Sequence, residues 1–99
     1  MKTRPFKFRG MSHMIRLTTA LMDIKGQIHG KAPLTTKGSG YQVAIQELGY
    51  PQPPKGEMYD LRILAEHLAD LIVQIESNLG MDTEGRMAEL MKGVYDAAV

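Results

Sequence analysis

Residues 57–79 read EMYDLRILAEHLADLIVQIESNL, the longest strongly periodic run in the chain. Large apolar residues recur in it at intervals of three and four, which is the spacing of one face of an α-helix and not the alternation of a strand. Burial of this face would contribute on the order of 10–20 kcal/mol before the ordering entropy is subtracted. We therefore predict a core helix, with a buried face made of Leu61, Leu64, Leu68, Leu71, Ile72, Ile75 and Leu79.

The segment that follows Ser12 has a second helical pattern. Ser is a residue type that caps helix N-termini, so we expect Ser12 to begin this helix. Thr18, Thr19 and Gly26 are weak helix formers, which means that packing must hold the helix together. Its apolar residues form a narrow seam of coiled-coil type, with Ile15 and Met22 beside it: Met14, Leu17, Leu21, Ile24 and Ile28.

Capping residues mark the ends of a short helix in the middle of the chain. Ser39 and Gln42 have the spacing of a capping box, and Gly49 followed by Tyr50 fits a Schellman motif. Together with a weaker amphipathic pattern near the C-terminus, this predicts an all-α fold. We expect residues 11–99 to form a single domain, a small bundle of about four helices near 12–29, 40–48, 57–79 and 83–97.

The composition excludes several classes of protein. The chain of 99 residues has the size of one domain, and the absence of cysteine excludes disulfides, thiolate catalysis and cysteine-ligated metal sites. Charged residues interrupt the longest apolar run, so we expect no membrane span. No apolar stretch follows the N-terminal charges, so we expect no secretory signal and predict a cytoplasmic protein.

Charge is distributed very unevenly along the chain. Residues 1–46 carry eight Lys or Arg and one acid, a net charge of +7, whereas residues 47–99 carry four Lys or Arg and ten acids, a net charge of −6. Such a split indicates either a polyanionic partner for the basic half, or basic and acidic halves that meet within one fold or between subunits. The sequence leaves both interpretations open.

The basic half begins with an extended arm, residues 1–10, in which Pro5 and Gly10 oppose helix formation. Either Phe6 and Phe8 pin this arm onto the domain, or its charges bind phosphates. The second interpretation gives an alternative function, a nucleic-acid-binding accessory protein. Its predicted contact residues are Lys2, Arg4, Lys7, Arg9, Arg16, Lys31 and Lys37.

His67, with Asp70 three residues later, is the only pattern that suggests chemistry. A di-iron helix motif would need Glu where the chain has Leu64, and no second matching pair occurs. No combination of nucleophile, base and orienting residue can be assembled from the sequence. We therefore predict a protein that is not an enzyme and has no catalytic residues, metal site or cofactor.

Apolar residues in unexpected places suggest a binding function. Ile63 and Val73 fall on the polar face of the long helix, and eight methionines are many for a chain of this length. We predict a small non-catalytic interaction or assembly module that binds a protein partner or itself through amphipathic helix faces. The predicted contact residues are Ile63, Val73, Met87 and Met91.

Overall fold

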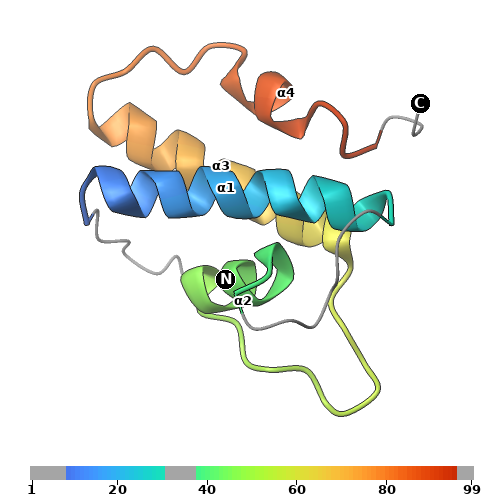
Figure 1. Ribbon diagram of the computed structural model, residues 1–99. Coiled ribbons are helices and arrows are strands. Elements are labelled where there is room, and N and C mark those ends of the chain that lie inside the picture. The colour runs from blue at the N-terminus through green and yellow to red at the C-terminus, as the bar shows by residue number, and fades with distance from the viewer. Residues whose placement is uncertain (1–8, 31–37, 96–99) are drawn as a thin grey trace.

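A computed structural model describes residues 9–30 and 38–95, and this part of the chain folds into helices without any strand. The predicted all-α small bundle is therefore confirmed. Of the predicted basic arm, residues 1–8 lie outside the described residues. Figure 1 shows the helices α1 (Met11–Ile28), α2 (Gly40–Leu48), α3 (Leu61–Asn78) and α4 (Arg86–Met91).

The two long helices, α1 and α3, form the centre of the bundle. They run in opposite directions, with α2 on one side of the pair and α4 on the other (Figure 1). α2 packs against both long helices, whereas α4 packs against α3. The long helices therefore form the scaffold, and the two shorter helices are attached to it.

The core lies where the apolar faces of α1 and α3 meet. The inner seam of α1 is fully buried at Leu17 and Ile24. The predicted face of α3 is buried at Leu64, Leu68, Ile72 and Ile75, whereas Leu71 is partly buried. Leu79 is an exception to the prediction, because it caps the C-terminus of α3 and is exposed. The coiled-coil-like seam of α1 thus packs inside a single chain.

Two helices, α1 and α2, lie close to their predicted positions in the chain. α2 spans the predicted residues, with the Ser39 hydroxyl accepting the Gln42 N–H at 3.4 Å. Gly49 is left-handed (φ 73°), and the Tyr50 N–H donates to the Ile45 carbonyl at 3.0 Å, as the Schellman motif predicts. α1 begins one residue early, with Gly10 and not Ser12 at its N-cap.

The other two helices are shorter than predicted. α3 begins at Leu61 because the Asp60 carboxylate accepts the N–H groups of Arg62 and Ile63, which caps the helix there. α4 spans six residues between Gly85 and Gly93, whose φ angles of 75° and 89° are left-handed. The predicted range 83–97 was therefore wrong at both ends, because these glycines break the helical pattern.

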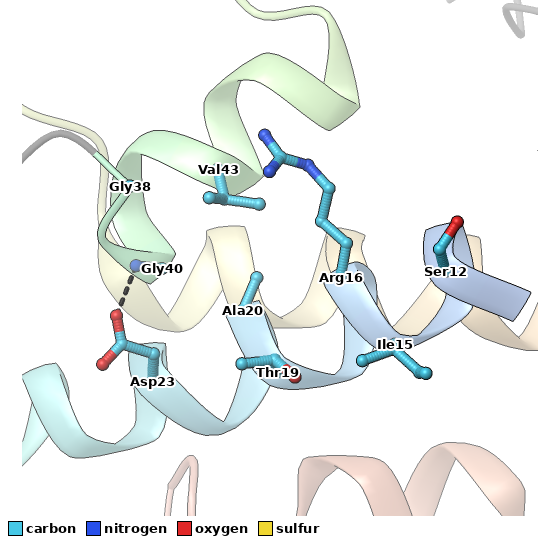
Figure 2. Close-up of a pocket in the computed structure, with 9 residues that line it drawn as sticks. All are labelled: Ser12, Ile15, Arg16, Thr19, Ala20, Asp23, Gly38, Gly40 and Val43. Atoms are coloured by element: carbon cyan, nitrogen blue, oxygen red, sulfur yellow. Dashed lines mark hydrogen bonds between the residues drawn. The ribbon is translucent and has the colours of Figure 1, made fainter.

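α1 and α2 are in close contact at Gly40, the first residue of α2. A Cβ atom at this position would lie 2.6 Å from the Ala20 carbonyl oxygen and 2.8 Å from Asp23 Cβ. The Gly40 N–H also donates to the Asp23 carboxylate, so that a side chain of α1 binds the N-terminus of α2 (Figure 2). Only glycine allows the two backbones to come this close.

We expect Gly40→Ala to lower the free energy of unfolding by about 1–3 kcal/mol, the usual cost of overpacking. The loss is expected although Ala favours helix over Gly by about 1 kcal/mol, because the added methyl would collide with backbone. Urea denaturation followed by circular dichroism measures the change. Thr19→Ala, an exposed change on α1, is the control and should leave the midpoint almost unchanged; equal midpoints for both variants would contradict the prediction.

Candidate interaction surface

A cluster of cationic and imidazole side chains surrounds Glu47 of α2. Its carboxylate accepts hydrogen bonds from Arg9 Nη2 at 2.7 and 2.8 Å, and from Arg16 Nε at 2.9 Å. His13 Nε2 lies 3.0 Å from the same carboxylate. The Glu47 side chain is only 8% exposed, so these contacts replace most of its hydration.

Helix periodicity brings the three partners of Glu47 together. Arg9, His13 and Arg16 are spaced by four and three residues, so they lie on one side of α1 and of the turn before it. The Arg9 backbone N–H donates to His13 Nδ1 at 3.2 Å, which leaves Nε2 to donate to Glu47. Arg16 Nη2 also donates to Gln46 Oε1 at 2.7 Å, which ties a second residue of α2 to α1.

The cluster lowers the pKa of Glu47 and retains a surplus of positive charge. Burial by itself raises the pKa of this carboxyl, but the hydrogen bonds from Arg9, Arg16 and His13 outweigh burial and hold the pKa below its usual value. Two guanidinium groups face one carboxylate. Because the Arg9 and Arg16 side chains are 56% and 43% exposed, the surplus charge is presented to solvent.

A groove of about 600 Å³ lies beside this cluster, between α1 and the N-terminal part of α2 (Figure 2). The buried side chains of Ala20 and Val43 give it an apolar floor, and Arg16 lies at one side. The volume is large enough for several side chains of a bound protein. The groove is lined by Ser12, Ile15, Arg16, Thr19, Ala20, Asp23, Gly38, Gly40 and Val43.

An exposed apolar stripe runs along α1 next to the groove. Met11, Ile15 and Met22 are 71%, 59% and 71% exposed, and together with Thr18 they are spaced by four, three and four residues. This spacing places them on one face of the helix. Ile15 belongs to both the stripe and the groove. The sequence prediction placed Ile15 and Met22 beside the inner seam of α1 and included neither of them among the predicted contact residues.

The structure separates the four residues predicted to contact a protein partner. Ile63 is 49% exposed on α3. Val73, Met87 and Met91 are partly buried and pack against the core. Their burial follows from the attachment of α4 to α3.

Hydrogen bonds and ion pairs hold α4 and the residues after it on α3. The Glu76 carboxylate accepts from Arg86 Nε at 2.9 Å, and Arg62 Nε donates to the Val94 carbonyl at 3.0 Å. Val73 lies three residues before Glu76 and is thus on the same side of α3. α4 therefore lies against the side of α3 that carries Val73 and Glu76.

The residues predicted to contact nucleic acid are only partly described. Arg9 and Arg16 are the cations that bind Glu47. The remaining predicted contacts lie outside the described residues: Lys2, Arg4, Lys7, Lys31 and Lys37. The structure therefore brings together two of these cations and binds them to an acid of the other half of the chain.

His67 lies against an aromatic pair. The hydroxyl of Tyr50 is hydrogen bonded to His67 Nδ1, and the ring centroids of Tyr50 and Tyr59 are 5.4 Å apart. Burial, and secondarily the neighbouring Tyr59, raises the pKa of Tyr50. Within residues 9–30 and 38–95, no group of three or more His, Asp or Glu side chains could hold a metal ion.

The chain matches no known protein family, no curated protein and no solved structure. In its described part, no helix has the length and apolar character needed to cross a membrane. The groove with its neighbouring stripe and arginines is the candidate interaction surface.

We expect Glu47→Gln to lower the free energy of unfolding by about 1–3 kcal/mol, because Arg9, His13 and Arg16 lose the charged acceptor that they share. Glu89→Gln is the matched control. Glu89 also bonds to an arginine, Arg86, but its side chain is 70% exposed. The control should change stability by less than about 0.5 kcal/mol, as exposed pairs do. Equal urea midpoints for the two variants would show that the Glu47 cluster does not stabilise the fold.

The effect of Glu47→Gln should depend on pH. Because the folded-state pKa of Glu47 lies below its usual value of 4.5, the stabilisation is complete above that value and is lost as pH falls through the lower folded-state pKa. The difference in unfolding free energy between wild type and Glu47→Gln should therefore narrow below about pH 4.5. Denaturation series at pH 7 and at acid pH measure it, and a difference that does not narrow would contradict the assigned pKa direction.

Proposed function

We propose that this protein is a non-catalytic interaction module that binds protein through the outer face of α1 and the groove beside it. The observation that carries the proposal is the alignment of Met11, Ile15 and Met22, all strongly exposed, on one helix face. Single exposed apolar residues are ordinary on protein surfaces, whereas a continuous apolar patch with a polar rim is typical of a binding site.

The shape and composition of this surface support helix recognition. The spacing of four, three and four residues matches the way in which one helix packs along another. The unbranched, polarisable side chains of Met11 and Met22 adapt to partners of different shape. The groove adds depth beside the stripe, so a partner can be held by an inserted side chain as well as by surface contact.

A nucleic-acid-binding function is the second candidate. It is favoured by the surplus positive charge of Arg9 and Arg16, both of which are partly exposed. It predicts affinity for a short mixed-sequence DNA that falls steeply with salt and weakens when residues 1–10 are deleted. Unchanged binding by the deleted protein would refute it.

The proposed interaction function predicts that Ile15→Asp abolishes protein association, because it places a charge in the centre of the apolar stripe. Light scattering coupled to size exclusion over a range of concentrations measures self-association. A pull-down with crosslinking measures association with a second protein. Ala88→Asp, which places the same charge on an exposed position of α4, is the control and should associate as wild type does.

Two results would contradict this proposal. One is a wild-type protein that stays monomeric at high concentration and recovers no partner. The other is Ile15→Asp and Ala88→Asp variants that associate equally well. Circular dichroism of both variants shows whether each is folded, so that loss of binding is distinguished from loss of structure.

A further inference from the structure

α3 carries a second exposed surface, which is acidic. Ile63 is about half exposed, and Glu66 and Asp70 follow it by three and seven residues on the same side of the helix. Within the described part of the chain neither carboxylate forms a salt bridge; Asp70 accepts a hydrogen bond from the Gln74 amide at 2.6 Å. We call this surface the acidic face of α3. It presents one branched aliphatic side chain beside two carboxylates that form no salt bridge among the described residues.

The acidic face of α3 and the groove with the adjoining Glu47 cluster are complementary in charge and in polarity. Arg16 lines the groove at the end that adjoins the Glu47 cluster, and there the half-exposed guanidinium groups of Arg9 and Arg16 outnumber the Glu47 carboxylate between them. The carboxylate in the lining of the groove, Asp23, accepts the Gly40 N–H. The groove also offers the apolar floor of Ala20 and Val43. The acidic face of α3 has the opposite charge, because it presents carboxylates around one apolar side chain. Complementary potentials of this kind favour a specific contact and speed its formation.

We infer that the occupant of the groove is the acidic face of α3 from a second copy of this chain. Ile63 of that copy enters the groove against Val43, while its Glu66 and Asp70 approach Arg9 and Arg16. This inference rests on the proposed function and names the partner. Within one copy both surfaces are exposed, so neither covers the other.

The charges also argue against the simplest alternative, in which the α1 surfaces of two copies meet. That contact would place the surplus positive charge of each Glu47 cluster close to that of the other copy, and like charges at an interface are unfavourable. A contact between groove and acidic face instead joins two different surfaces. The contact is therefore heterologous. After each copy is added, the assembly still has one free groove and one free acidic face, so it continues to grow into a ring or a filament.

A mixing experiment tests this arrangement. Ile15→Asp disables the groove surface and keeps the acidic face, whereas Ile63→Lys disables the acidic face and keeps the groove. Each variant alone should be monomeric by light scattering. Mixed in equal amounts, they should form a heterodimer and nothing larger, because one intact groove meets one intact acidic face and growth then stops. Ala88→Asp is the control and should assemble as wild type does.

A double variant, Glu66→Gln with Asp70→Asn, tests the charges without adding bulk. Both positions are exposed, so the fold should be retained. Its self-association should be roughly tenfold weaker than that of wild type at low salt, and the two proteins should converge at high salt, where screening removes the advantage of the carboxylates.

The possible failures are distinguishable. If wild type and Ile63→Lys assemble equally while Ile15→Asp does not, and the mixture restores nothing, the α1 surfaces meet each other and the inferred arrangement is overturned, while the proposed function stands. If wild type is monomeric but recovers another protein through Ile15, the inference is also overturned and the function again stands. If nothing associates, both are overturned.

Discussion

The contact between the inner seam of α1 and the apolar face of α3 is the interaction on which the rest of the structure depends. Leu17 and Ile24 on one helix and Leu68 and Ile72 on the other are completely buried. Helices of this length are marginal alone in water, so each long helix requires the apolar face of the other. With that contact made, α2 and α4 attach to the pair, both by burying apolar side chains in the core and through specific polar contacts.

The attachment of α2 shows how a packing constraint and an electrostatic one act together. Gly40 allows the N-terminus of α2 to approach the α1 backbone, and Glu47 at the other end of α2 binds Arg9 and Arg16. These two contacts hold the ends of α2 on α1. The groove lies beside them and shares Gly40 and Arg16, so the contacts that attach α2 also shape the candidate binding surface.

The uneven charge of the chain is partly resolved inside the fold. Arg9 and Arg16 belong to the basic half and Glu47 to the acidic half, so the halves meet at this cluster. They do not cancel there, because two arginines face one carboxylate, and Glu66 and Asp70 lie on the other long helix without an ion pair among the described residues. The residual charges of both signs are the basis of the proposed association between copies.

Local patterns in the sequence determined the helices, the buried faces of α1 and α3, and the ends of α2, because apolar spacing and capping act over a few residues. The Asp60 cap and the glycines at 85 and 93 are also local signals. The apolar pattern extends past them, however, so the predicted helices were too long. The Glu47 cluster was not predictable in this way, since its hydrogen bonds join residues 31 to 38 positions apart. Whether Val73 or Ile63 is exposed was likewise decided only by tertiary structure, because it depends on where α4 packs on α3.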